Sequence, residues 1–221
     1  MIDTTFLISA FVTLFVIIDP IGLTPLFVAL TAGEGATRRR ILALRAVIIA
    51  AILLTLFAVA GERVLGFVGI SMPAFRIAGG MLLFLTALDM LFERRTKRRK
   101  DQAEGNDPFA EDGDTTPAVD EDEIDPSVFP LAIPLIAGPG AIASMILLTG
   151  QAEGLAGLAA VIGVMLVVLM LVFLAFLAGG LLERLLGHTG INVITRLLGM
   201  LLAALAVQFV LDGLKAFGFA A

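Results

Sequence analysis

The sequence Asp19-Pro20-Ile21-Gly22 interrupts the first long apolar run of the chain, which extends from Phe6 to Leu30. Pro20 has no N–H to donate to a helical hydrogen bond, and its ring clashes with the preceding turn. Gly22 adopts non-helical backbone angles at little cost. A carboxylate beside such a break is costly in a bilayer and is tolerated where it lines a cavity or is buried in protein. The stretch is therefore either a kink that shapes the fold or part of a binding site.

The composition of the whole chain is that of a membrane protein. Hydrophobic residues make up 59% of the 221 residues and the mean hydropathy is +1.02, whereas soluble domains are about 45–50% apolar. The chain has no Cys, which excludes disulfides and thiolate metal sites, and its single His188 cannot form a His-rich metal site. Its first residues include no Lys or Arg. We therefore expect the first apolar run to be retained as a spanning segment and not cleaved as a signal peptide.

Six stretches have the roughly 20 apolar residues that a transmembrane helix needs, and they predict an all-α membrane protein. The loop between the third and fourth stretches is highly charged, so we expect it to be mostly disordered and cytoplasmic. The predicted organisation is a first three-helix repeat, 1–92, the charged loop, 93–126, and a second three-helix repeat, 127–221. The predicted helices are approximately 5–30, 42–61, 69–92, 127–150, 155–180 and 190–213.

The distribution of Lys and Arg predicts how these helices are oriented. Ten basic residues fall in the loops after the first, third and fifth helices, whereas only Arg63 follows the second helix and none follows the fourth. Basic residues favour the cytoplasmic side, so both termini of this multi-pass protein are expected outside the cytoplasm. The same topology explains the basic cluster from Arg94 to Lys100, and we expect no nucleic-acid partner.

The two halves of the chain resemble each other. Pro20 and Pro139 interrupt the first and fourth predicted helices 119 residues apart, and Arg76 and Arg196 begin similar Gly- and Leu-rich sequences 120 residues apart. Because each half has three spans, the second half enters the membrane from the opposite side. This arrangement is a 3+3 inverted-topology repeat. Helices broken by Gly and Pro at matching positions of such repeats point to the binding site of a secondary transporter.

The two breaks together supply a predicted substrate site. The half-helix after each break presents free N–H groups and the positive end of its dipole, which suits a carboxylate, and the carbonyls before the break suit a cation. Two such breaks near the middle of the bilayer would bind a small zwitterion. The alternative is a pair of kinks that only shape the bundle. The predicted substrate-binding residues are Asp19, Pro20, Gly22, Thr24, Gly138, Pro139, Gly140 and Ser144.

Asp19 has two expected roles, which are compatible with each other. It lies about 13 residues, or about 20 Å, from the outer end of the first predicted helix, so it could bind a coupling ion, H⁺ or Na⁺. Its structural role would be to cap the restarted half-helix or to pair with an arginine. Arg196 is the expected partner because its depth is closer to that of Asp19, and Arg76 is the second candidate. For both arginines, the alternative is a side chain that extends to the lipid headgroups.

Motifs of enzymes are absent from the sequence. It has no Gly-x-x-x-x-Gly-Lys-Ser/Thr phosphate loop, no recognisable nucleophile–base pair and no metal-ligand spacing. We therefore expect neither an ATP-driven pump nor an enzyme, and no cofactor apart from a coupling ion. A homo-oligomer is compatible with the sequence.

Three stretches of the chain resemble the MarC family of six-span inner-membrane proteins, which includes SnatA-type transporters of small neutral amino acids. They are Asp19 to Phe27, Pro130 to Ile142 and Arg196 to Phe209, and the Ala-Gly-Pro-Gly-Ala-Ile sequence in the second is the most specific. The resemblance implies ion-coupled transport of glycine- or alanine-like solutes across the cell membrane of a bacterium or archaeon. The family usually has Asn where this chain has Leu23, which implies a different specificity if that Asn contacts the substrate.

The sequence leaves two other functions open. One is export of amino acids or related metabolites on the same scaffold. The other is a membrane scaffold or assembly factor that transports nothing.

Overall fold

The computed structural model describes residues 4–92 and 125–218, and the charged loop predicted at 93–126 lies almost entirely outside them. All regular secondary structure in the described residues is helical, which confirms the all-α prediction. Five helices are long and apolar enough to cross a membrane, or six if one bent pair counts as a single span. The elements are α1 (Thr4–Ile18), α2 (Pro20–Leu30), α3 (Ala36–Val68), α4 (Met72–Leu91), η1 (Ser127–Ile136), α6 (Pro139–Thr149), α7 (Gly154–Leu177) and α8 (Gly179–Ala216).

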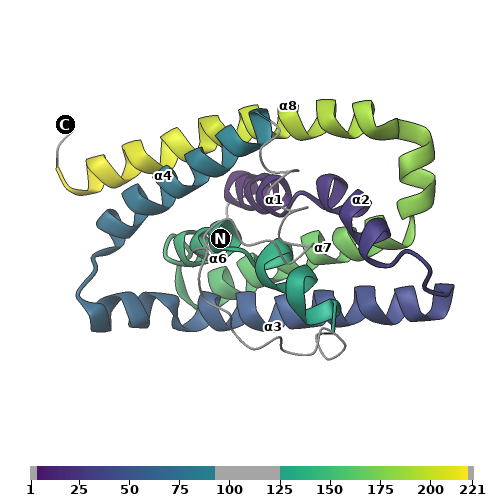
Figure 1. Cartoon of the computed structure of the whole chain (residues 1–221). Helices are drawn as coiled ribbons and strands as arrows, with labels where there is room; N and C mark the ends of the chain where they lie inside the picture. Colours follow the sequence, from purple (N-terminus) through teal and green to yellow (C-terminus); the bar gives the residue numbers. More distant parts are fainter. Residues whose placement is uncertain (1–3, 93–124, 219–221) are drawn as a thin grey trace, which may run out of the picture.

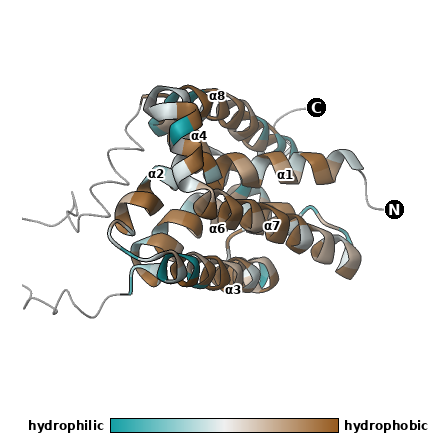
Figure 2. Cartoon of the chain, turned by 90° about the vertical axis from the view of Figure 1, so that its right-hand side faces the viewer, coloured by the Kyte–Doolittle hydropathy of each residue, from teal (hydrophilic) through white to brown (hydrophobic). Residues whose placement is uncertain are grey.

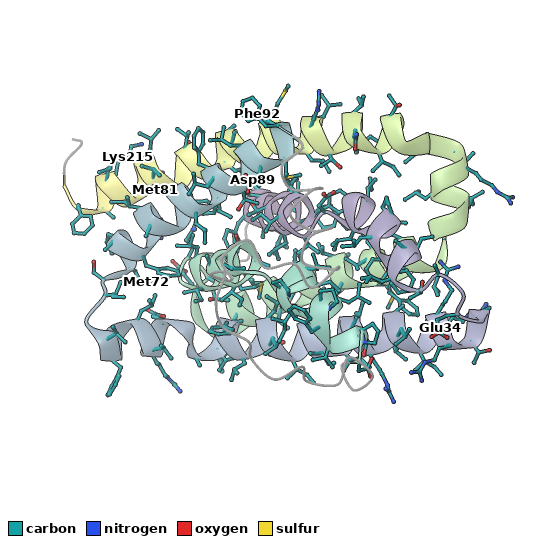
Figure 3. All side chains as sticks on the ribbon, in the orientation of Figure 1. Glu34, Met72, Met81, Asp89, Phe92 and Lys215 are labelled. Carbon is teal, nitrogen blue, oxygen red and sulfur yellow. The ribbon has the colours of Figure 1, made fainter. Side chains whose placement is uncertain are left out.

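The short helices occupy the interior of the bundle and the long helices surround them (Figure 1). α1 packs against α6, α7 and α8, whereas α6 packs against α1, α3, α4 and α7. α3 extends along the whole bundle, from the end marked by Glu34 to the end marked by Met72 (Figure 3). The helix breaks at residues 19 and 138 therefore lie between helices that cover them.

Hydrophobic residues make up most of the helices (Figure 2), and many large apolar side chains are exposed on the outside of the bundle. On α3, the large side chains of Ile48, Ile52 and Leu56 are exposed, whereas Ala46 and Ala50 are fully buried. A soluble helix would place its large apolar residues inward, because burial from water drives its packing. Small residues inside and large apolar residues outside are what a helix that contacts lipid requires.

α4 and α8 run alongside each other in unusually close contact (Figure 1). Glycines on both helices allow this approach. A Cβ built at Gly80 would lie 2.8 Å from the Ala206 carbonyl oxygen, and a Cβ built at Gly213 would lie 3.0 Å from the Pro73 carbonyl oxygen. Because lipid gives no hydrophobic drive for helices to associate, close packing of this kind is a main source of their attraction.

Two helices extend beyond the limits that the apolar runs predict. α3 begins at Ala36 and ends at Val68, because Arg and Glu are good helix formers and continue it past the apolar stretch at 42–61. The connection expected around Arg184 is not a loop, and this prediction was wrong: α8 starts at Gly179 and is interrupted at Gly187, where φ is 60°. Glycine tolerates this left-handed value without the steric cost of a Cβ.

The segment before the second break is also less regular than the sequence predicts. Within η1, Phe129 and Ile133 have extended backbone angles (φ −126° and −127°). Each of them precedes a proline, whose ring disfavours helical angles in the preceding residue. η1 and α6 are bent by 54° relative to each other. The irregular region therefore covers the stretch from residue 129 to 138, whereas the sequence interpretation placed it only at 138–140.

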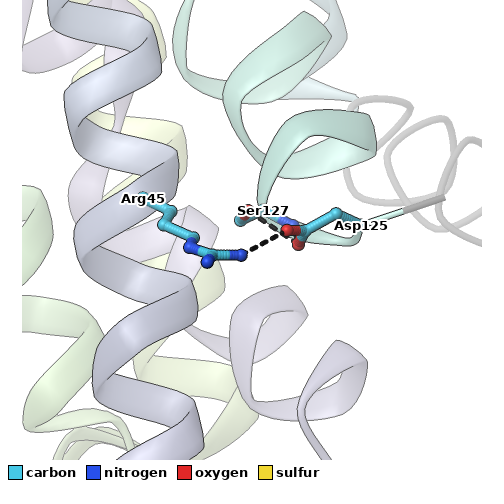
Figure 4. Close-up of polar contacts among 3 residues, drawn as sticks. All are labelled: Arg45, Asp125 and Ser127. Atoms are coloured by element: carbon cyan, nitrogen blue, oxygen red, sulfur yellow. Dashed lines mark hydrogen bonds and ion pairs between the residues drawn. The ribbon is translucent and has the colours of Figure 1, made fainter.

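An ion pair joins α3 to the start of η1 (Figure 4). Arg45 Nη1 lies 2.9 Å from Asp125 Oδ2. The other carboxylate oxygen accepts hydrogen bonds from the Ser127 hydroxyl at 2.7 Å and from the Ser127 N–H at 3.0 Å. These two hydrogen bonds from Ser127 are the main cause that lowers the pKa of Asp125 below its ordinary value of 3.8; burial opposes them, and Arg45 lowers the pKa further.

This contact predicts a loss of stability in acid. Because the pKa of Asp125 is lowered in the folded state, its contribution is complete above the unfolded value of 3.8 and is lost as the pH falls through the native pKa. Thermal melting in detergent between pH 7 and pH 3 should therefore show a difference between the wild-type protein and Asp125→Asn that shrinks towards pH 3. A difference that stays constant over this range would contradict the prediction.

Candidate functional site

Asp19 separates α1 from α2 and is fully buried. Its backbone is left-handed (φ 56°, ψ 67°), and no other non-glycine residue in the described part of the chain has a positive φ. Its Oδ1 accepts a hydrogen bond of 3.0 Å from the Gly22 N–H, so Asp19 caps α2. The cap was one of the two roles expected for this residue. A Cβ at Gly22 would collide with the Asp19 carboxylate, which explains why glycine is needed there.

The break removes helical partners from carbonyls at the end of α1. Pro20 has no N–H to offer the Val16 carbonyl. The Gly22 N–H, which would otherwise bond the Ile18 carbonyl, donates to Asp19 instead. Asp19 N–H still bonds Phe15 and Leu23 N–H bonds the Asp19 carbonyl. A buried carboxylate and two carbonyls released from the helix therefore lie within four residues. Oxygen atoms of these kinds are the ligands that small cations prefer.

The second break lacks a corresponding carboxylate. α6 begins at Pro139, and no side chain caps its N-terminus. A Cβ at Gly138 would lie 2.5 Å from the Pro134 carbonyl oxygen, so this position excludes any capping side chain. The Ile142 N–H bonds the Gly138 carbonyl. Within the described residues, the N–H groups of Gly140 and Ala141 have no acceptor, as expected for the first turn of an uncapped helix.

The structure brings the two breaks together. A Cβ built at Gly140 would lie 3.5 Å from Ile17 Cγ2, and Ile17 is two residues from Asp19. The same point would be 3.6 Å from a methyl carbon of Leu83 and 3.8 Å from the hydroxyl oxygen of Thr86, both on α4. The absence of a side chain at Gly140 thus leaves α1, α4 and α6 in contact at the start of α6.

The two predicted hydroxyl residues have local partners. Thr24 Oγ1 donates to the Pro20 carbonyl at 2.8 Å, and Ser144 Oγ donates to the Gly140 carbonyl at 2.8 Å. Both side chains are fully buried. Each hydroxyl therefore donates its hydrogen bond to a carbonyl near the start of its own half-helix, and its oxygen can still accept a hydrogen bond.

The two predicted arginines lie on the α4–α8 pair. Arg76 is half-buried on α4, and its Nε has no hydrogen-bond partner among the described residues. Arg196 is exposed on α8, whereas Asp19 is completely buried. The pairing of Asp19 with Arg196 remains a prediction.

Two polar features of this region are not evident from the sequence. At the far end of α2, Arg39 Nε donates to the hydroxyl of buried Thr31 at 3.1 Å, and its guanidinium lies 5.9 Å from the ring centre of Phe27. Phe27 stacks on Phe176 of α7 with ring centres 4.3 Å apart. The other feature is Thr13 on α1, which is fully buried and whose hydroxyl has no partner in the described residues. Its helical spacing is that of an ordinary core residue, so no local pattern marks it.

Comparison with known proteins identifies the family. Residues 4–217 match the model of the MarC family integral membrane protein. A "UPF0056 membrane protein" of Archaeoglobus fulgidus is 38% identical over 211 residues, which cover 95% of this chain and 92% of the relative. A similar protein of Aquifex aeolicus is 36% identical over 208 residues, covering 94% and 92%. "UPF0056 inner membrane protein YhgN" of Escherichia coli is 32% identical over 209 residues, covering 95% and 96%.

No solved structure matches the chain. The names of the relatives state no substrate and no mechanism. The family match and the inner-membrane relative agree with the apolar outer surface and the five to six spanning helices. The chain is a multi-pass integral protein of the inner membrane, and it belongs to the MarC family.

Proposed function

We propose that the protein is a secondary transporter of small neutral amino acids, such as glycine or alanine, which works by alternating access and is coupled to H⁺ or Na⁺. The observation that carries this proposal is the contact between the two helix breaks, one with a buried carboxylate and the other with an uncapped helix N-terminus. A carboxylate suits an ammonium group or a cation, and a helix N-terminus suits a carboxylate. A small zwitterion carries both of the groups that these two breaks suit, an ammonium group at one end and a carboxylate at the other.

The packing of the two halves supports an inverted repeat, on which alternating access would depend. α2 packs against α7 and α8, and its counterpart α6 packs against the equivalent helices of the other half, α3 and α4. Similarly, α1 packs against α7 and η1 against α3. Both half-helices have 11 residues and begin at proline.

The α4–α8 pair supports the same relation. Arg76 is followed by Gly80, where a Cβ would lie 2.8 Å from the Ala206 carbonyl oxygen, and Arg196 is followed by Gly199, where a Cβ would lie 3.3 Å from the Ala87 carbonyl oxygen. Each helix thus presents a glycine to the backbone of the other. We propose that α4 and α8 are equivalent elements that meet around the axis relating the two repeats.

The basic residues support an orientation with both termini outside the cytoplasm. Arg38 and Arg40 are exposed at the start of α3, close to Glu34. Met72 and Lys215, at the start of α4 and the end of α8, lie at the opposite end of the bundle (Figure 3). Placing the arginine-rich end in the cytoplasm follows the positive-inside rule.

The proposal is tested by uptake into proteoliposomes. We expect labelled glycine or L-alanine to accumulate only when a proton or Na⁺ gradient is imposed, and dissipation of that gradient by an ionophore should stop accumulation. Efflux from preloaded vesicles without uptake would favour export. No gradient-dependent flux of any small amino acid in either direction would leave a non-transporting membrane scaffold as the better explanation.

A further inference from the structure

The N-termini of the two half-helices are chemically different although their positions correspond. At α2, the Asp19 carboxylate accepts the Gly22 N–H at 3.0 Å. At α6, the corresponding position is Gly138, and the N–H groups of Gly140 and Ala141 find no acceptor in the described part of the chain. The first half-helix thus contains its own anion, whereas the second lacks one. A side chain at Gly138 cannot supply this anion, because its Cβ would lie 2.5 Å from the Pro134 carbonyl oxygen.

Thr13, on the helix α1 that packs against α6, is an independent sign of a missing ligand. Its side chain is 0% exposed, and its hydroxyl has no partner among residues 4–92 and 125–218. Five other hydroxyls of the described helices donate to the carbonyl four residues before them, and the Thr13 hydroxyl does not do so. These five belong to Thr24, Thr31, Thr86, Ser144 and Thr149. A buried hydroxyl without a hydrogen bond is costly, and each such group in a native protein calls for a partner.

Thr13 lies one helical turn from the residue of α1 that approaches the start of α6. Thr13 is four residues before Ile17, so the two side chains share one face of α1, about one turn or 5.4 Å apart. Ile17 is the residue whose methyl carbon would lie 3.5 Å from a Cβ built at Gly140. α1 and α6 lie side by side in the interior of the bundle, as both views show (Figures 1 and 2). Thr13 therefore lies on the same face of α1 as the residue that approaches the uncapped end of α6.

We propose that the N-terminus of α6 and the Thr13 hydroxyl together form the subsite for the carboxylate of the transported solute. This assignment rests on the proposed function and adds the orientation of the bound solute. The carboxylate binds α6, and the ammonium group or the coupling ion binds the Asp19 side. The N–H groups of Gly140 and Ala141 and the Thr13 O–H are all donors, and a carboxylate provides acceptors for them. Thr13 is then a residue that determines specificity for solutes with a free carboxylate.

The test compares Thr13→Val with Thr13→Ser. Valine keeps the shape of threonine and removes the hydroxyl, so we expect the KM for glycine and L-alanine in proteoliposomes to rise about tenfold, the usual effect of losing one hydrogen bond to a charged group. Serine restores the hydroxyl and should restore the KM. Inhibition of uptake by glycinamide, which lacks the carboxylate, should change much less. The melting temperature of Thr13→Val should be unchanged or higher, because the variant loses an unpartnered buried hydroxyl.

Thr149→Val is the matched control, because its hydroxyl is bonded to the Met145 carbonyl at the other end of α6; its KM should stay at the wild-type value. If the wild-type protein transports glycine and Thr13→Val has the same KM, the carboxylate assignment is overturned and the proposed function stands. The same conclusion follows if Thr13→Val weakens inhibition by glycinamide as much as it raises the KM for glycine. If the wild-type protein does not transport glycine or L-alanine and is not stabilised by them against heat, the carboxylate assignment and the proposed function are both overturned.

Discussion

Replacing Asp19 with Asn is expected to abolish ion-driven uptake while the protein stays folded. Asparagine caps helices about as well as aspartate, and it tolerates the left-handed backbone that Asp19 adopts at φ 56°. The substitution therefore preserves the hydrogen bond to Gly22 while it removes the charge. Neutralising a buried charged group that holds a cation costs about 2–5 kcal/mol. Gradient-driven uptake of glycine or L-alanine by Asp19→Asn should accordingly fall by about 30-fold or more.

Asp19→Ala provides the matched comparison, because it removes the cap as well as the charge. Loss of an N-cap costs about 1 kcal/mol, and alanine in a left-handed conformation costs about 1–2 kcal/mol more. Asp19→Ala should therefore melt at a lower temperature than Asp19→Asn, and neither should show coupled uptake. Transport by Asp19→Asn at the wild-type rate would show that Asp19 acts only as a helix cap and that the coupling ion binds elsewhere.

Much of the fold follows from local properties of the sequence. The apolar runs account for the helical spans, and the prolines at 20 and 139 account for the starts of two helices, because proline suits the first position of a helix and usually costs stability in its interior. The limits of α3 and α8 were less predictable. Helices continue in charged sequence beyond the apolar run, so hydropathy marks the lipid-facing part of a helix and not its end.

The arrangement of the site depended on contacts that no local pattern encodes. The close approach of Ile17 to Gly140 brings together residues that are far apart in the sequence, and nothing in the spacing of either residue predicts it. Thr13 has the periodicity of a core residue, and only the packed structure shows that its hydroxyl is left without a partner. Conversely, Thr24 and Ser144 were expected to serve a ligand, but in the structure each hydroxyl donates to its own helix. Short polar side chains in helices commonly form such bonds.

Gly80→Ala is expected to destabilise the protein more than a glycine substitution usually does. The new Cβ would lie 2.8 Å from the Ala206 carbonyl oxygen and 3.0 Å from the Val210 N atom. Both are backbone atoms of α8, which cannot rotate away as the end of a flexible side chain can. α4 and α8 would have to move apart along their length. Overpacking of this kind costs about 1–3 kcal/mol, and in lipid no hydrophobic force compensates for the lost contact.

Gly163→Ala is the control for Gly80→Ala, since it lies in the interior of α7 with no atom within 4 Å of the added Cβ. Alanine favours the helix over glycine by about 1 kcal/mol, so Gly163→Ala should melt at the same or a higher temperature than the wild-type protein. Circular dichroism during heating in detergent measures both variants. Equal melting temperatures for Gly80→Ala and Gly163→Ala would show that α4 and α8 are not in close contact in the membrane. A lower value for Gly80→Ala alone, accompanied by loss of transport, would show that the packed α4–α8 pair is required for the working protein.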